Sequence, residues 1–140
     1  MDFRLLNGEA VISRITLKKD SATLINPGRM VALASGLAVE ADENSTSIAF
    51  AEFGAAIGET TVLVTKEKEL IYEGTGNTVP YSASDIGLIC DMAISGSTQL
   101  IDLGNTTTKV FQINVKAGSV IDGEVKPIQV FINKPLVTNE

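Results

Sequence analysis

The stretch that decides the fold is Gly36-Leu37-Ala38-Val39-Glu40-Ala41-Asp42-Glu43-Asn44-Ser45-Thr46-Ser47-Ile48-Ala49-Phe50. It has the pattern of two short strands of small and β-branched residues, separated by a run of Asp, Glu, Asn and Ser, most of which favour turns. Elsewhere the apolar runs are also short, and Gly, Pro, Asn, Asp and Ser interrupt them at frequent intervals. This rhythm predicts an all-β chain with little helix, folded as a small β-barrel or β-sandwich with extended terminal arms.

The strands and turns can be placed from the same signals. The expected strands are 10–18, 29–34, 37–41, 47–53, 60–65, 69–72, 87–94, 99–103, 109–115 and 128–133. Tight hairpins are expected at Ser35-Gly36 and Asp122-Gly123, and a type II turn at 26–28, where Pro27 precedes Gly28. The only helical signal is a single turn over 82–85.

The length of 140 residues favours one folded domain, described here as an N-terminal arm over 1–17 and a single β-rich domain over 18–140. Hydrophobic residues make up 44% of the chain but aromatic residues only 5%, so small aliphatic side chains must fill the interior. The residues expected in the core are Leu33, Val39, Ile48, Phe50, Val62, Val64, Ile89, Ile113, Val115 and Val130.

The charge pattern argues against nucleic acid as a direct partner. The formal net charge is −6, and a nucleic-acid binder needs Lys and Arg gathered on one face. Lys18-Lys19 is followed at once by Asp20, and 66–69 alternates in sign, so both segments are interpreted as solvated. No secretory signal or membrane-spanning window is recognised, which predicts synthesis in the cytoplasm and no membrane partner.

Reactive groups are few. The chain has no histidine, which excludes imidazole bases, Ser-His-Asp triads and Cys-His dyads. Its one cysteine, Cys90, lies in an apolar run and is interpreted as a buried thiol. The carboxylates available for acid–base work are Glu40, Asp42, Glu43, Asp85, Asp91 and Asp102. Without Trp and with two Tyr, a glycosidase that stacks sugar rings is disfavoured.

Two motifs have weak alternatives. The turn 42–45 carries closely spaced oxygen ligands, but it lacks the alternating spacing and distal Glu of a calcium loop. The segment Gly74-Thr75-Gly76-Asn77 resembles a fragment of a phosphate loop without the following helix or lysine, and is interpreted as a mobile loop. We therefore expect no catalytic site, no cofactor and no metal, and a protein that is not an enzyme.

The sequence contains a weak internal similarity, which we call the echo. Gly36-Leu37, followed by 45–48, resembles Gly87-Leu88, followed by 97–100. The echo suggests two similar strand–turn–strand units, although Gly, Ser and Thr recur in any turn-rich β chain.

The segments 30–33, 36–42 and 45–50 resemble the core segment of the head decoration (capsid cement) proteins of tailed bacteriophages, including the lambda-type decoration protein. The similarity covers about a third of the chain, which is longer than the lambda-type protein and carries a C-terminal extension. The resemblance implies a virion protein, a homotrimer bound to the major capsid protein on the exterior of the expanded head, with an N-terminal arm that orders on contact with the shell.

Under this hypothesis the apolar residues of the arm would contact the capsid, because a disordered segment can gain main-chain hydrogen bonds at a sheet edge while alternate side chains fill pockets. These residues are Phe3, Leu5, Leu6, Val11, Ile12, Ile15 and Leu17. Two other hypotheses fit an acidic β-rich chain: a phage tail-tube or baseplate protein, and a surface carbohydrate-binding module, which the scarcity of aromatic residues disfavours.

Overall fold

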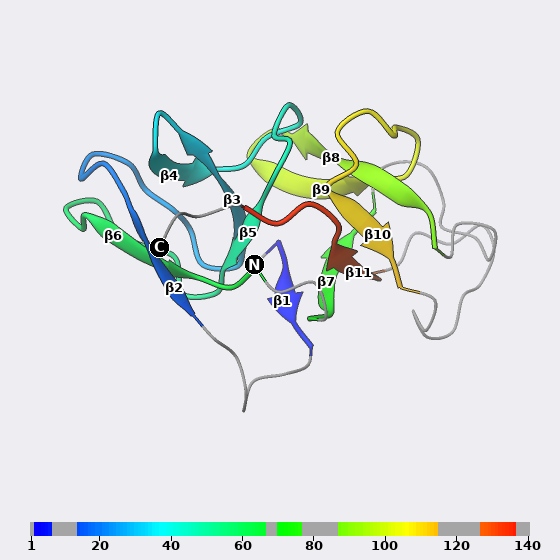
Figure 1. Cartoon of the computed structure of the whole chain (residues 1–140), viewed down its shortest axis with the longest axis horizontal. Helices are drawn as coiled ribbons and strands as arrows, with labels where there is room; N and C mark the ends of the chain where they lie inside the picture. Colours follow the sequence, from blue (N-terminus) through cyan, green and yellow to red (C-terminus); the bar gives the residue numbers. More distant parts are fainter. Residues whose placement is uncertain (1, 7–13, 67–69, 77–86, 115–126, 137–140) are drawn as a thin grey trace.

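The computed structural model describes residues 2–6, 14–66, 70–76, 87–114 and 127–136. These residues form strands in three sheets and no helix, so the predicted all-β class is confirmed (Figure 1). The sheets pack on one another in a sandwich-like arrangement. The strands are β1 (Arg4–Leu5), β2 (Ile15–Lys18), β3 (Arg29–Ala34), β4 (Leu37–Glu40), β5 (Ala49–Ala51), β6 (Thr61–Val64), β7 (Tyr72–Thr75), β8 (Ile89–Ser95), β9 (Thr98–Asp102), β10 (Phe111–Ile113) and β11 (Pro127–Ile132).

Strands β2 to β6 form what we call the N-terminal unit, on the left of Figure 1. β3 pairs with β4 and β5, and β2 pairs with β6, all antiparallel. A bridge between Phe50 and Thr65 joins the two small sheets, with reciprocal N–H···O bonds of 2.8 and 2.9 Å. The spatial order is therefore β2-β6-β5-β3-β4, and β2 also contacts β4.

Strands β7 to β11 form the C-terminal unit, whose order is β7-β11-β10-β8-β9, again antiparallel. A bridge from Gly76 to Ile101 brings the first and last strands of this order together. If the strands of each unit are numbered along the chain, both units have the same order, first-fifth-fourth-second-third. The two units thus repeat one topology, while β1 adds a sixth strand at the edge of the second.

The sequence echo points to this repetition in the wrong register. Leu37 begins β4, the third strand of its unit, whereas Leu88 precedes β8, the second strand of its own. The equivalent turns are instead Ser35-Gly36 and Gly96-Ser97, which join the second and third strands of each unit.

Two hydrophobic clusters make the core, and β5 lies between them. Ile48 and Phe50 belong to the larger cluster, which also takes side chains from the C-terminal unit, such as Tyr72 and Met92. The residues in between, such as Ala49, face a smaller cluster inside the N-terminal unit. Because side chains alternate along a strand, β5 needs large residues on one face and alanines on the other.

Polar groups also cross the seam between the units. The buried side chain of Gln99 pairs with Met30 as a neighbouring strand would: Oε1 accepts from Met30 N at 2.8 Å, and Nε2 donates to Met30 O at 2.8 Å and Ala41 O at 2.9 Å. The buried hydroxyls of Thr65 and Tyr72 lie 2.9 Å apart. Packing and hydrogen bonds therefore fix the two units together.

Most expected strands are confirmed within a few residues. Residues 29–34 form a strand with the predicted bounds, and Gly28 has the predicted positive φ, 79°. Ser35 and Gly36 have φ of 51° and 82° between paired Ala34 and Leu37, as a type I′ hairpin requires. The hairpin at 122–123 and the helical turn at 82–85 lie outside the described residues.

The predicted loop at 74–77 is wrong over its described part. Gly74 and Thr75 belong to β7, and Gly76 bridges to Ile101, so the expected strand 69–72 ends where the real one begins. Gly74 stands in a strand because Phe3 takes the place of its side chain: a Cβ there would lie 2.3 Å from Phe3 Cε1. β1, which Phe3 precedes, was not predicted.

Six of the expected core residues are buried, namely Ile48, Phe50, Val62, Val64, Ile113 and Val130. Val39 and Ile89 are half-buried, and Val115 lies outside the described residues. Leu33 is 38% exposed, because β5 pairs only with 29–31 of β3 and leaves the end of β3 protruding. Cys90 is buried as predicted.

The prediction that Lys18 and Lys19 are both solvated is correct for Lys18 and wrong for Lys19. Lys18 is exposed, but Lys19 is 3% exposed and its ammonium group donates to the carbonyl oxygens of Asp20 and Thr23. Lys19 therefore ties down the turn that follows β2.

Candidate binding face

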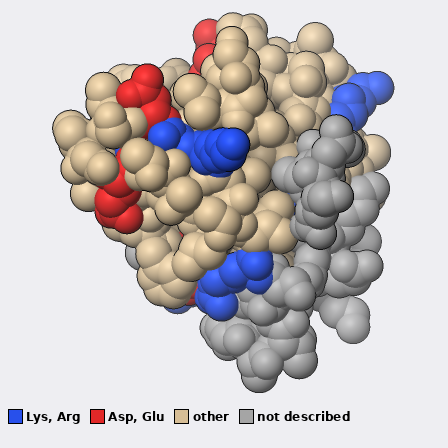
Figure 2. All heavy atoms as spheres, turned by 60° about the vertical axis from the view of Figure 1, so that its left-hand side comes forward, with Lys and Arg blue, Asp and Glu red and all other residues tan. Residues whose placement is uncertain are grey.

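Large apolar side chains are exposed on one unit of the molecule. Among the described residues these are Leu24, Leu33, Phe53, Ile57 and Leu63, with exposures from 38% to 68%. All of them belong to the N-terminal unit. Figure 2 looks onto this side and shows a broad uncharged surface on which Lys, Arg, Asp and Glu side chains are scattered. Leu33 lies at the hairpin end of β3, whereas Phe53 lies beyond the opposite end, where Arg29 pairs with Ala51. We therefore call Leu24, Phe53, Ile57 and Leu63 the apolar face.

Backbone pairing brings two loops of the apolar face together. Ile25 and Ala55 form an antiparallel bridge, with N–H···O bonds of 3.0 and 2.8 Å, and Gly58 N donates to Ser21 O at 2.7 Å. Because Ile25 points into the core, its neighbour Leu24 points outward, while Ile57 is exposed in the turn that follows Ala55. Leu24 and Ile57 thus lie on paired loops at one end of the unit.

A second part of the face surrounds Arg14. Its Nη2 lies 2.8 Å from Glu52 Oε2, and its guanidinium lies 5.3 Å from the centre of the Phe53 ring. Leu63 is close to this group, because the Phe50–Thr65 bridge places Glu52 opposite Leu63. The guanidinium thus lies over the Phe53 ring, a contact that contributes about 0.5 to 1 kcal/mol at an exposed site.

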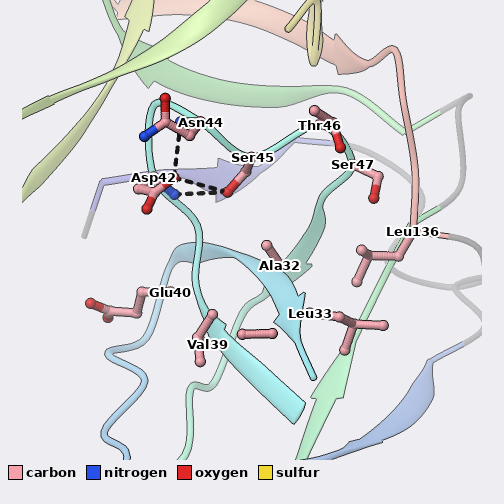
Figure 3. A pocket seen from close by; sticks show the side chains of 11 residues that line it. Ala32, Leu33, Val39, Glu40, Asp42, Asn44, Ser45, Thr46, Ser47 and Leu136 are labelled. Carbon is pink, nitrogen blue, oxygen red and sulfur yellow. Dashed lines mark hydrogen bonds between the residues drawn. The ribbon is translucent and has the colours of Figure 1, made fainter. Parts of the chain in front are cut away.

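A hollow of about 410 Å³, open to solvent, lies beside the β3–β4 hairpin (Figure 3). Its floor is made of the small side chains Ala32, Ala34 and Val39, and loop 42–47 forms its wall. Leu136 closes one side, held by a hydrogen bond of 3.0 Å from its N to Ile48 O. The hollow combines an apolar floor with a polar rim.

In the turn 42–45, side-chain oxygens accept hydrogen bonds from backbone N–H groups of the same turn. Asp42 Oδ1 accepts from Asn44 N at 2.9 Å, and Ser45 Oγ accepts from Asp42 N at 3.0 Å, the contacts dashed in Figure 3. Glu43 is exposed. The predicted solvated turn agrees with this geometry, since Asp and Ser side chains here replace missing backbone partners.

Among the candidate carboxylates that the structure describes, Asp91 alone is buried. It is 2% exposed, and it accepts hydrogen bonds from the backbone N–H groups of Thr107, Thr108 and Lys109 at 3.1, 2.8 and 2.8 Å. Burial is the largest single influence and would raise the pKa of Asp91, but the donors together outweigh it and lower the pKa below its ordinary value. Asp91 is thus an anchor for loop 105–109 that carries its charge at neutral pH, which suits neither a proton donor nor a general base.

Two further candidates lie near others: Asp102 stands opposite Asp91 on β9, and Glu40 lines the hollow together with Asp42. Glu40 Oε2 lies 3.7 Å from Arg29 Nε and accepts from Asn26 N, while Asp102 accepts from Gly104 N at 3.1 Å. Asp85 lies outside the described residues. Over the part of the chain that the structure describes, no three Asp, Glu or Cys side chains gather as metal ligands would.

The predicted contact residues of the arm are placed unevenly. Phe3, Leu5 and Leu17 are 1%, 9% and 7% exposed and belong to the chain's own core. Leu6 and Ile15 are half-buried, while Val11 and Ile12 lie outside the described residues. The predicted boundary after Leu17 falls within β2, which pairs with β6. In this structure, then, the described parts of 1–17 are integrated in the sheets.

Sequence reasoning missed the apolar face. Phe53 and Ile57 each precede a glycine, and Leu24 lies two residues before Asn26-Pro27. A large apolar residue within such a turn-rich segment is the signal that could have found them. Over the described segments, no helix could cross a membrane.

Comparison of the chain with protein-family models, with curated proteins and with solved structures yields no match.

Proposed function

We propose that this chain is a decoration protein of a tailed bacteriophage. It binds the exterior of the expanded head as an oligomer, with the major capsid protein as its partner, and stabilises the shell against the pressure of packaged DNA. The proposal is supported by the resemblance of segments 30–33, 36–42 and 45–50 to that class, and by an all-β fold of the expected kind.

The observation that carries a binding role is the apolar face. Monomeric soluble proteins expose scattered single apolar residues, whereas several large ones gathered on one side mark an interaction surface. Phe53 and Ile57 are 63% and 68% exposed, yet the described part of the C-terminal unit exposes no large apolar side chain to a comparable degree. We assign the capsid contact to this face, with the C-terminal unit directed away from the shell.

Such a surface binds strongly only when several copies of it act together. Each face offers few apolar anchors, and linking several copies in one oligomer raises the overall avidity by about 10² to 10⁴ without any new contact. The net charge of −6 keeps free copies apart in solution and suits a partner that is protein.

The test is binding to expanded heads that lack the protein. The wild-type chain should sediment with such heads and raise the temperature at which they rupture, whereas Phe53→Ser should weaken binding at least about tenfold, since a central aromatic anchor carries more than one decade of affinity. Phe131→Ser is the matched control, because Phe131 is a half-buried phenylalanine on the outer side of β11 in the other unit.

The proposal fails if the wild-type chain does not sediment with the heads or gives them no added resistance. If Phe131→Ser and Phe53→Ser weaken binding equally while both stay folded, the contact does not lie on the apolar face.

A further inference from the structure

Residues 2–6, which we call the strap, lie at the outer edge of the six-stranded sheet, where β1 pairs with β7. Arg4 stands opposite Glu73 with Nε–Oε1 at 2.8 Å, and Leu6 N donates to Ile71 O at 2.8 Å. The strap therefore binds as an added strand, the geometry in which a sheet edge recognises an extended peptide.

A specific slot receives the aromatic residue of the strap. Phe3 is 1% exposed, its ring centre lies 5.4 Å from that of Phe111, and its N donates to Gly28 O at 2.9 Å. The slot exists because residue 74 is glycine: any Cβ there would overlap the Phe3 ring.

Charges set the register of the strap in the slot. Asp2 Oδ2 accepts from Gln99 N at 2.7 Å and lies 3.2 Å from Arg29 Nε, so one carboxylate holds both units. One step further along the edge, Arg4 meets Glu73. The slot is complementary to the pattern acidic–aromatic–basic–aliphatic, which is the pattern of 2–5.

Every partner of the strap is remote in sequence. Asp2 and Gln99 are 97 positions apart, and Arg4 and Glu73 are 69 positions apart. The slot is thus complete without the residues adjoining the strap, and it cannot distinguish the strap of its own chain from that of another copy. β1 pairs with β7 alone, so the strap can leave without breaking any other strand pair.

From this geometry we infer that the slot also binds the strap of a second copy, so that residues 2–6 are exchanged between neighbouring molecules. Residues 7–13 separate the strap from Arg14, a length of chain that can reach about 25 Å when extended. Exchange keeps every contact of the slot, so it links copies at little cost in free energy. The inference rests on the self-association contained in the proposed function, and it is tested on the purified chain with no capsid present.

The experiment uses disulfide trapping across the β1–β7 pair. One full-length chain carries Arg4→Cys and a second carries Glu73→Cys, two positions that face each other on an antiparallel pair at a distance suited to a disulfide. Both side chains reach the surface, with exposures of 63% and 23%, so the substitutions leave the core intact. The two chains are mixed in denaturant, refolded together at high concentration and oxidised.

The expected product is a disulfide-linked dimer of the two different chains. A mixture of Lys18→Cys and Thr61→Cys chains is the matched control, because these residues also face each other, but within the N-terminal unit. It should give at least about tenfold less mixed dimer, since pairing of β2 with β6 is internal to one unit. A synthetic peptide of residues 1–6 added before oxidation should lower the yield from the first mixture only.

A chain carrying both Arg4→Cys and Glu73→Cys shows that the pair can react, by closing within one molecule. If that chain closes while the mixed chains give no more dimer than the control mixture, the strap stays with its own chain and the inference is overturned. Capsid binding by the wild-type chain would be unaffected by this result, so the two proposals can fail separately.

Discussion

At the scale of single residues, the polar groups of the interior are placed where backbone groups lack partners. Gln99 supplies the acceptor for Met30 N, and it gives a second donor to Met30 O, which also accepts from Ala41 N. Asp91 supplies an acceptor to three successive N–H groups of the loop that leads into β10. Neither residue lies in a pattern that marks such a role, because what each satisfies comes from a distant part of the chain.

Asp91 should make stability depend on acid. Its pKa is lowered in the folded chain, so the contribution of its charge is complete above the pKa of the unfolded chain and is lost as pH falls through the lower, folded value. Unfolding by urea, measured between about pH 7 and pH 2, should show a steep loss below about pH 4 in the wild type. Asp91→Asn should lower stability by about 1 to 3 kcal/mol at neutral pH and flatten this acid dependence.

Asp20→Asn is the control for that series, since Asp20 is exposed and, among the described contacts, its carboxylate accepts only from the nearby Ala22 N. If Asp91→Asn and the wild type lose stability in parallel down to the lowest pH, the charge of Asp91 is not what holds loop 105–109.

At the scale of elements, tight turns fix the path of the chain. Two turn glycines allow the cost of backbone strain to be distinguished from the cost of steric overlap. Gly36 and Gly54 both have positive φ, 82° and 63°. A Cβ at Gly36 would meet nothing within 4 Å, whereas one at Gly54 would lie 2.3 Å from Ile25 O and 2.7 Å from Pro27 N. Backbone atoms cannot give way as a side chain can.

We therefore expect Gly36→Ala to lower the free energy of unfolding by about 1 to 2 kcal/mol, the cost of a left-handed residue with a side chain. Gly54→Ala should cost about 3 to 4 kcal/mol, because it also displaces the two hydrogen bonds of the Ile25–Ala55 bridge, at about 1 kcal/mol each. Urea denaturation measures both. Equal losses would mean that strain alone acts and that the loop moves aside freely.

The elements also show what the sequence could and could not predict. Strands such as 29–34 and the Ser35-Gly36 hairpin follow from local signals, and the structure confirms them. β7 was misjudged because Gly74 is explained only by Phe3, a residue 71 positions away, which no local pattern reveals. The apolar face was missed for a similar reason: whether Phe53 is buried depends on which loops meet above it.

At the scale of the molecule, the two units repeat one strand order but share one core. The larger cluster draws Met30, Ile48 and Phe50 from the first unit and Tyr72 from the second, with the Phe50 and Tyr72 rings 5.0 Å apart. The smaller cluster is almost wholly internal to the first unit and takes only Leu136 from beyond β6. Separation of the units would expose the larger cluster, so neither unit is expected to be stable alone.

Because the two units share the larger cluster, we predict that a destabilising substitution in one unit also lowers the stability of the other. Val62→Ala removes two buried methyl groups from the smaller cluster and should lower the free energy of global unfolding by about 2 kcal/mol. Native-state hydrogen exchange should then show the same loss of protection in the amides of β8 and β10 as in β3, because all of them exchange through one cooperative opening. Thr61→Ala, at the exposed neighbouring position, should change neither set. Protection of β8 and β10 that stays at its wild-type level in Val62→Ala would show instead that the repeated units open independently.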